Sequence, residues 1–480
     1  MQPTAALTMA EDLTQIAHLL DQTLSPDAIA VPAATDALDR LSLTPHFPFY
    51  LLSISTGAGN QGQKIAAATY LKNLIRRTVD STGVKPSNVS KEFKDQLMQA
   101  LLQVELSVLK ILVEVFRTIA VADFVKQNLW PELVPNLQSA IQNSHLISGS
   151  NTKWNTVNAL LVLHALLRPF QYFLNPKVAK EPVPPQLELI SKEILVPLLA
   201  VFHQFVEKAL ATHGIAEKKT EKVLLTICKC LHFAVKSYMP STLAPLLLSF
   251  CRDLMSILGS LSFDCVVNQE DEYLTRLKTG KRSLLIFSAL VTRHRKHSDK
   301  WMPEIINCVL NIVKFTKNTS KLPFLSERLL SLGFDVISNI LETGPGWRLV
   351  SPHFTTLLES AIFPALVMND KDMSEWEEDP DEYIQKNLPS DIDEISGWRE
   401  DLFTARKSAV NLLGVISMSK GPPMETATDS LSASSKRKKG QKNKKSNQRR
   451  SMGELLVLPF LSKFPIPSAS NLSQKKILNE

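Results

Sequence analysis

Apolar residues recur every three to four positions along most of this chain, from residue 8 to about residue 369. This spacing places one apolar stripe on each of a long series of amphipathic helices. Short polar connections separate the helices, with Pro or Gly near their starts and ends. No stretch shows the alternation of a half-buried strand. The predicted helices cover 9–23, 33–43, 46–55, 62–78, 90–103, 105–121, 122–128, 130–143, 153–174, 184–211, 215–237, 240–260, 278–296, 302–316, 324–343 and 351–368.

Helices of this length cannot bury their apolar stripes alone, whereas stacked helix pairs bury each stripe against the next pair. The 480 residues also exceed what one ordinary globular core holds. Glycine is scarce, at 16 residues, and the 28 prolines suit helices with sharp ends. The pattern predicts an all-α fold, a HEAT- or ARM-type α-solenoid whose antiparallel helix pairs form a right-handed superhelix.

One internal similarity supports the prediction of repeats. The segment 128–141 resembles the segment 299–312, and both place a Trp shortly before a Pro-Glu pair. Pro suits the first turn of a helix, and Glu there meets the positive end of the helix dipole. Pro131 and Pro303 are 172 positions apart, which predicts about four repeats of about 43 residues each.

Two opposed charge blocks interrupt the helical pattern in the last quarter of the chain. Residues 370–394 hold eleven acidic residues and two lysines. So acidic a segment is too polar for a core helix, and we expect a loop over 370–397 with a short helix around 379–386. Trp376, Tyr383 and Ile384 are apolar anchors that a merely solvated linker would lack. The helical pattern resumes at 398–417.

The second block, residues 436–450, holds nine Lys and Arg residues and no acidic residue. It lies in a low-complexity stretch that cannot form a core and is expected to be disordered. Three interpretations stay open: a nuclear-localisation peptide, a nucleic-acid-binding arm or a loop without a fixed partner. It contains no aromatic residue, so nucleic-acid binding would depend on phosphates and salt, and we do not expect it. Transient pairing with the acidic block is a further option.

Enzymatic and metal chemistry find little support. The five cysteines follow no zinc spacing, and Cys228 and Cys230 are interpreted as buried helix residues in a reduced, intracellular protein. Nucleotide-loop, zinc-protease and serine-hydrolase motifs are absent, and no nucleophile–base pair is evident. We therefore predict no enzyme activity, no cofactor and no metal. No uninterrupted apolar run is long enough to predict membrane insertion.

The glycines of Gly57-Ala-Gly-Asn-Gln-Gly62 fit a dinucleotide-binding fingerprint, with Asp80 about 20 residues further on. A dinucleotide fold needs further alternating strands and helices, and none follow. The interpretation that we favour is a polar loop between two helices of the solenoid.

The segment Lys64 to Arg77, KIAAATYLKNLIRR, carries a more specific signal. On a helix, Ala67, Ala68, Leu71, Leu74 and Ile75 share one face, and Thr69, Lys72, Asn73, Arg76 and Arg77 share the other. The string resembles the A-x-x-Y-L-K-N-x-I helix near the amino terminus of importin-β family transport receptors. That family usually has a Trp soon afterwards, and here Thr78-Val79-Asp80 follows instead.

Two further strings resemble the same family in the same order. Trp130-Pro-Glu-Leu-Val-Pro135 is similar to the helix start of its third repeat. The segment 375–384, EWEEDPDEYI, resembles the W-x-E-D-P-x-E-Y-I segment of large importins and of the export receptor that recycles importin-α. This string favours the importin-seven/eight or importin-eleven branch.

The resemblance covers roughly residues 10–418 and implies a karyopherin, of which we expect this chain to be an amino-terminal half. It implies the following division: GTPase-binding HEAT repeats at 1–150, further repeats at 151–369, an acidic loop at 370–397, a solenoid helix at 398–418, a disordered basic loop at 419–453, and a short apolar segment with a polar tail at 454–480.

The family resemblance also implies partners. They are a Ran-type small GTPase in its GTP form, Phe-Gly nucleoporins and a protein cargo, which we expect to be basic. We expect a monomer that shuttles between cytoplasm and nucleus through the pore. The predicted contacts to a basic partner are Glu377, Glu378, Asp379, Asp381 and Glu382, beside Trp376 and Tyr383. Lys72, Arg76 and Arg77 are weaker candidates for a GTPase contact.

Two other functions are considered. A HEAT scaffold without a transport role would explain the solenoid but not the three strings, and its binding would not depend on the nucleotide state of a GTPase. A nucleic-acid-binding protein would depend on residues 436–450.

Overall fold

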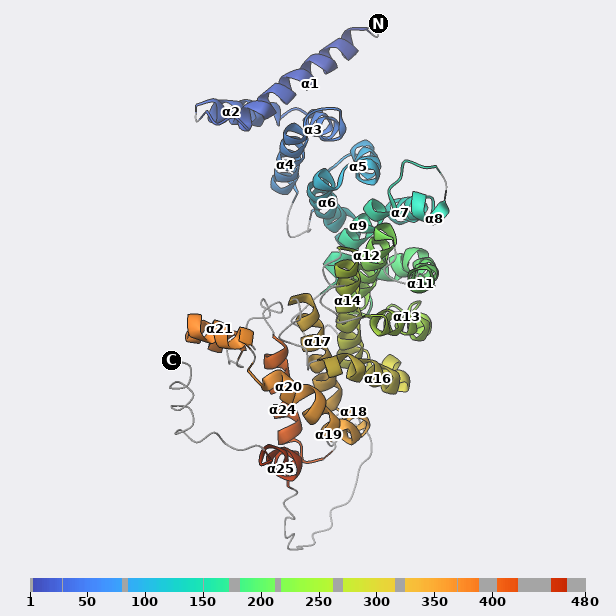
Figure 1. The fold of residues 1–480 in the computed structure, drawn as a ribbon. Helices are drawn as coiled ribbons and strands as arrows, with labels where there is room; N and C mark the ends of the chain where they lie inside the picture. Colours follow the sequence, from blue (N-terminus) through green and yellow to red (C-terminus); the bar gives the residue numbers. More distant parts are fainter. Residues whose placement is uncertain are drawn as a thin grey trace, which may run out of the picture. The chain divides into compact units, whose positions relative to one another are not determined.

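The computed structural model describes residues 3–27, 29–79, 85–149, 151–171, 182–211, 217–261, 271–315, 324–368, 370–387, 404–421 and 450–463. All regular structure in these ranges is helical (Figure 1), which confirms the predicted all-α class. The chain divides into two compact units, Met1–Asp253 and Leu254–Glu480.

The first unit contains α1 (Pro3–Thr23), α2 (Ala30–Leu41), α3 (Phe47–Thr56), α4 (Gln61–Thr78), α5 (Lys91–Gln103), α6 (Leu106–Ala120), the π-helix η1 (Val121–Lys126), α7 (Leu133–Gln142), α8 (His145–Ser148), α9 (Thr156–Leu167), the 3-10 helix η2 (Arg168–Phe170), α10 (Pro185–Ile190), the π-helix η4 (Ser191–Leu195), α11 (Val196–Ala211), α12 (Lys218–Val235) and the 3-10 helix η5 (Ala244–Leu246).

Helix α13 (Leu247–Gly259) crosses the division. The second unit continues with α14 (Asp271–Arg293), α15 (Arg295–Ser298), the 3-10 helix η7 (Asp299–Trp301), α16 (Met302–Val313), α17 (Phe324–Leu341), α18 (Gly344–Val350), the 3-10 helix η9 (Ser351–His353), α19 (Phe354–Leu357), the π-helix η10 (Leu358–Ile362), α20 (Phe363–Leu366), α21 (Asp370–Glu378), α22 (Pro380–Asn387), α24 (Ala405–Met418), the π-helix η12 (Gly453–Val457) and α25 (Leu458–Leu461).

Within the first unit, the second helices of successive pairs lie side by side. Helices α4, α6, α9 and α12 contact one another in that order, and α3, α5, α7 and α11 pack against them as first helices. Helix α9 shows the consequence, because ten of its twelve residues are buried. A helix that is apolar all round belongs between other helices, and α9 is covered by its own partner and by both neighbouring pairs.

Polar residues fix where several of these helices begin. The side chain of Asn60 accepts a hydrogen bond from the Gln63 amide at 2.7 Å at the start of α4, and Ser90 accepts one from the Phe93 amide at 3.2 Å at the start of α5. Such caps satisfy backbone donors that the first turn leaves open. The loop Gly57–Gly62 therefore joins two helices, α3 and α4, as the favoured interpretation predicted. No strand precedes it, so it is not a dinucleotide-binding turn.

Each of the two similar segments contains a buried tryptophan. The number of helix pairs between the segments differs from the prediction. Trp130 precedes α7 and is 4% exposed, and Trp301 precedes α16 and is 5% exposed. Each helix pair has a first and a second helix. Between α7 and α16, the described residues contain two other helices that come first in a pair, α11 and α13. The two segments are thus three helix pairs apart, and the prediction of four was wrong. A lengthened first helix accounts for part of the difference, because Pro185–Ala211 forms a continuous helical run of 27 residues.

The same run, Pro185–Ala211, is long and apolar enough by length and composition to cross a membrane, and it is the one such run in the described ranges. Its buried residues recur every three or four positions, with Leu198, Phe202 and Val206 as examples, and Lys192 and Glu207 are exposed between them. It packs with α12, in the manner of an amphipathic helix in the stack.

In the second unit, α14, α17 and α24 lie side by side in that order, and α16 packs on α17. The short apolar segment near the end of the chain forms η12 and α25. Its Phe460 meets Phe363 edge to face, with ring centres 5.6 Å apart. The segment is thus part of the core of this unit.

The acidic block is more ordered than the sequence suggested. We expected a loop with one short helix around 379–386, and the structure shows two helices, α21 and α22, over 370–387. The prediction of a loop was wrong for this part, because α21 contacts α22 and α22 contacts α24. The rest of the predicted loop, residues 388–397, and most of the basic run at 436–450 lie outside the described residues.

Candidate functional site

The helix α4 presents the three basic candidates of the first unit. Ala67, Ala68, Leu71 and Ile75 are buried against the neighbouring helices, as predicted, whereas Leu74 is half-buried. On the opposite face, Arg76 and Arg77 are exposed and Lys72 is half-buried.

Of these three basic residues, only Arg77 bonds to Asp39 of α2 in the described residues. The Oδ1 atom of Asp39 accepts hydrogen bonds from the Tyr70 hydroxyl and from Nη1 of Arg77, the latter at 3.5 Å. Burial, and then the bond to Asp39, raise the pKa of Tyr70. Arg77 is therefore paired with α2, although so exposed a pair adds little to stability. Lys72 and Arg76 have no side-chain partner within the described residues, so their charges are available to a partner protein.

A buried ion pair gives Trp130 a structural role, and this pair was not predicted from the sequence. Nζ of Lys94 lies 2.7 Å from Oδ2 of Asp123, and the side chains are 11% and 2% exposed. Asp123 also accepts hydrogen bonds from the backbone amide and the hydroxyl of Ser87. The ammonium group lies 5.4 Å from the centre of the Trp130 ring, which covers it. This part of the family-like pattern thus serves stability.

The acidic helices α21 and α22 carry the other candidates. The rings of Trp376 and Tyr383 meet edge to face at 5.7 Å, with an interplanar angle of 86°. Tyr383 is 8% exposed, but Trp376 is 41% exposed and Ile384 is 40% exposed. Tyr383 is therefore the anchor of the pair, and Trp376 and Ile384 keep apolar surface beside the acidic residues.

Arg406 of α24 holds these helices in place and was not found from the sequence. Its guanidinium group donates to the Tyr383 hydroxyl and the Asp372 carboxylate, and to the carbonyl oxygens of Ala365 at 3.3 Å and Val367 at 3.0 Å. The side chains of Arg406 and Asp372 are only 12% and 14% exposed. An i,i+3 or i,i+4 search cannot find a partner 34 positions away, so no local signal marked it.

The five predicted contact acids, Glu377, Glu378, Asp379, Asp381 and Glu382, are all exposed. Oδ1 of Asp379 accepts a bond from the Glu382 amide at 2.9 Å and so caps α22. A cavity of about 440 Å³ is lined by Glu375, Glu378, Asp379, Glu382 and Tyr383. In the described residues, no ion pair neutralises any of the five acids. The surface is therefore suited to a basic partner, and its charge is concentrated on two short helices.

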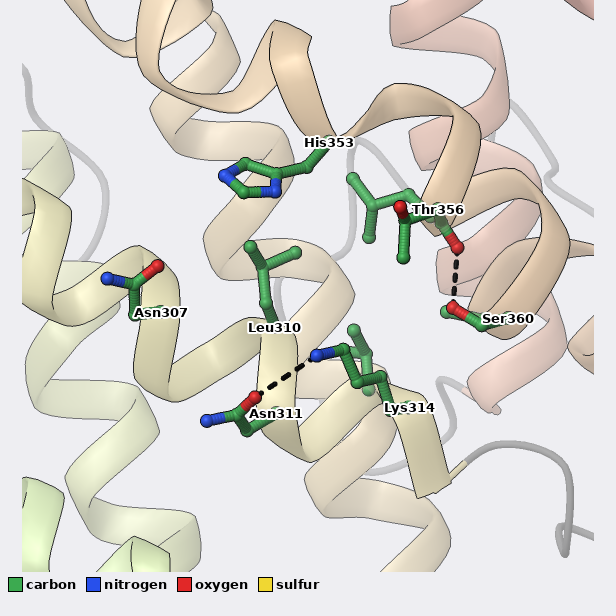
Figure 2. Close-up of a pocket in the computed structure, with 10 residues that line it drawn as sticks. Asn307, Leu310, Asn311, Lys314, His353, Thr356 and Ser360 are labelled. Atoms are coloured by element: carbon green, nitrogen blue, oxygen red, sulfur yellow. Dashed lines mark hydrogen bonds between the residues drawn. The ribbon is translucent and has the colours of Figure 1, made fainter.

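Three further depressions lie between first helices of neighbouring pairs. One is lined by residues of α3 and α5, including Leu52 and Gln99. Another is lined by α7, η4 and α11, including Ile141 and Leu198. The third lies between α16 and the α19–η10 run and has a volume of about 180 Å³. Figure 2 shows it, with Leu310 at its base and polar side chains around it.

The described residues contain no group of three or more His, Cys, Asp or Glu side chains arranged to hold a metal ion. Cys228 and Cys230 are buried in α12, as the interpretation as helix residues predicted. Burial raises the pKa of the Cys230 thiol, so the side chain stays a neutral, apolar core residue.

Comparison with known proteins shows what this chain is similar to. The Importin-beta N-terminal domain model matches residues 34–103. The chain is 23% identical to the importin beta-like SAD2 homolog of Arabidopsis thaliana over 81% of its own length and 37% of that protein. It is 20% identical to human exportin-2 over 86% of its own length and 41% of that protein.

Among solved structures, the exportin Cse1 in its cargo-free, cytoplasmic state matches with a TM-score of 0.66 and 18% identity, over 84% of this chain and 42% of that one. The chain thus spans about two fifths of the length of the relatives that it matches. The amino-terminal domain match, the similarity to importin-like and exportin-like receptors and the shared fold agree with the three sequence strings, and the chain is similar to importin-β superfamily receptors over their amino-terminal part.

Proposed function

We propose that this chain is a nuclear import receptor that binds a Ran-type GTPase in its GTP form. The observation that carries the proposal is the match of the amino-terminal importin-β domain to residues 34–103. These residues run from α2 to α5 and include the exposed face of α4. We assign the GTPase contact to this region, with Lys72 and Arg76 as its available cations. No enzyme activity is part of the proposal.

The proposed cargo is a basic protein that binds the acidic surface of α21 and α22. Support comes from the five exposed carboxylates that have no counter-ion in the described residues, and from the exposed ring of Trp376 next to them. Such a surface attracts a basic partner over several ångströms and releases it as salt rises. The Trp376 ring then adds an apolar or cation–π contact.

Phe-Gly nucleoporins are proposed to bind the depressions between first helices. The depressions at α3–α5 and at α16 combine apolar groups with polar rims, which suits an apolar side chain held on flexible backbone. Several weak sites along one chain would allow rapid exchange within the pore. The receptor would then shuttle between cytoplasm and nucleus as a monomer.

The deciding experiment is a pair of titrations of the 480-residue chain, against Ran loaded with GTP and against Ran loaded with GDP. We expect strong preference for the GTP form. Replacing Lys72 and Arg76 together with Ala should weaken the GTP-form complex by about tenfold, because exposed interfacial ion pairs contribute up to about 1 kcal/mol each. Lys110→Ala, on α6, serves as the matched control.

Binding that ignores the nucleotide state would instead favour the alternative function, a HEAT scaffold without transport. Nucleic-acid binding is tested separately by deletion of residues 436–450. Loss of a nucleic-acid complex with the GTPase preference unchanged would identify that run as an independent arm.

A further inference from the structure

The depression between α16 and the α19–η10 run differs chemically from a plain apolar groove. Its floor consists of Leu310, Val313, Leu357 and Ala361, which are at most 7% exposed. Its rim carries Asn307, Asn311, Lys314, His353, Thr356 and Ser360. No Asp or Glu lines it, and the acidic residues Glu304 and Glu359 of the two flanking elements are not among its lining residues.

The rim has an excess of hydrogen-bond donors. The Lys314 ammonium group donates to Oδ1 of Asn311 at 3.3 Å, and in the described residues it has no acidic partner. The side chains of His353 and Asn307 have no hydrogen-bond partner in that same part of the chain. Figure 2 shows the His353 ring and the Lys314 ammonium group on opposite sides of Leu310. An ammonium, an imidazole N–H and an amide N–H can each donate to a carboxylate, and the charged ammonium group forms the strongest of these bonds.

The depression has room for a side chain. Its volume of about 180 Å³ corresponds to roughly six water molecules at about 30 Å³ each. The apolar floor favours an apolar side chain, and the rim favours a negative group next to it. A free anion would satisfy only the rim and would leave the floor in contact with water.

We propose that this depression binds an extended peptide in which an apolar side chain is followed directly by Asp or Glu. The apolar group fills the floor at Leu310 and Leu357, and the carboxylate accepts from the Lys314 ammonium group on one side of it. This inference rests on the proposed function only in treating the depression as a peptide site. It adds a charge preference that an uncharged Phe-Gly segment does not satisfy.

The test uses three fluorescent peptides of equal length that contain Phe-Glu, Phe-Gly or Phe-Lys between Gly-Ser flanks. They are titrated against the full chain with labelled Leu, Val and Ala methyl groups, so that shifts at Leu310, Val313 and Ala361 localise binding. We expect the Phe-Glu peptide to bind about fivefold more tightly than the Phe-Lys peptide, with the Phe-Gly peptide between them. The preference should shrink as salt rises from low to physiological concentration.

Lys314→Gln should remove most of the preference while leaving the chain folded, because Lys314 is exposed. Lys314→Arg should restore it, and Lys300→Gln, an exposed lysine outside the depression, should leave it unchanged. Equal affinities for the three peptides, a preference that survives Lys314→Gln, or an absence of shifts at the three methyl groups would each overturn the proposal. Complete displacement of the Phe-Glu peptide by inorganic phosphate at equal ionic strength would show that binding needs no apolar group, which would also overturn the proposal.

The GTPase titration on the same preparation separates this result from the proposed function. Loss of the charge preference with intact selectivity for the GTP form would refute only the inference. Charge preference without GTPase binding would refute only the receptor assignment.

Discussion

Arg406 of α24 donates from Nη1 to the hydroxyl oxygen of Tyr383 in α22, and its guanidinium carbon lies 5.7 Å from the centre of the Tyr383 ring. The same guanidinium group pairs with Asp372, so one side chain connects α24 to both acidic helices. The acidic surface is thus supported by a largely buried cation rather than displayed on a free loop.

Replacing Arg406 with Ala should release α21 and α22 from the second unit. The change removes the Arg406 guanidinium group from the partly buried Asp372 carboxylate and from the Tyr383 hydroxyl, and we expect a local cost of about 3 kcal/mol. Hydrogen exchange of residues 370–387 should accelerate, whereas exchange in α3–α6 should not change. Arg295→Ala is the control, because the Arg295–Glu342 pair spans 3.9 Å with side chains 37% and 63% exposed. Unchanged protection over 370–387 in the Arg406 variant would show that other contacts suffice.

Asp123→Asn should destabilise the first unit strongly. The variant leaves the buried Lys94 ammonium group without a counter-charge, and breaking such a pair costs about 3–5 kcal/mol. Exchange rates in α5 and α6 report the loss locally, which avoids assuming two-state unfolding of a long repeat array. Glu132→Gln breaks the exposed Lys91–Glu132 pair nearby and should cost less than about 1 kcal/mol. Equal effects of the two variants would contradict the buried-pair interpretation.

The contact between α11 and α13 should weaken as pH rises from 6 to 8. Nδ1 of His203 lies 2.8 Å from Oδ1 of Asp253, and this bond raises the pKa of His203, with a smaller contribution from Glu207. Burial raises the pKa of Asp253 at the same time. A raised histidine pKa means that the stabilisation is complete below the ordinary value of about 6.5 and is lost as pH passes the folded value.

Exchange protection of α13, corrected for the intrinsic pH dependence of exchange, measures this effect. His203→Gln should remove the pH dependence, and His297→Gln, an exposed histidine on α15, should preserve it. A slope of opposite sign in the unmodified chain would contradict the assignment.

Neutralising the acidic surface should weaken binding of a basic peptide by about tenfold and flatten its salt dependence. The variant combines Glu377→Gln, Glu378→Gln, Asp379→Asn, Asp381→Asn and Glu382→Gln. Asn at position 379 retains an oxygen for the cap of α22, so the helix should persist. Circular dichroism and exchange of residues 370–387 verify folding. Undiminished affinity and an unchanged salt slope in a folded variant would exclude these acids as the cargo contact.

Helix positions followed closely from the sequence where the apolar stripe was regular. The predicted helix 62–78 is α4 at Gln61–Thr78, and 324–343 is α17 at Phe324–Leu341. Agreement was poorer where helices change geometry. The predicted helix 351–368 is divided into η9, α19, η10 and α20. The π-helix η10 and two prolines interrupt the regular α-helix. Such interruptions depend on packing as much as on local preference.

Some features of this protein thus follow from its sequence alone, and others depend on its tertiary structure. Period-3.6 apolar stripes, capping residues and short polar connections determined an all-α stack, because those signals act within a few residues of one another. The acidic block was also evident, since charge density needs no partner to be recognised. Tertiary structure alone decided that Asp372 and Tyr383 meet Arg406 and that Lys94 is buried on Asp123 beneath Trp130. Those pairings join side chains on different helices, and burial, rather than residue type, determines which charge needs a partner.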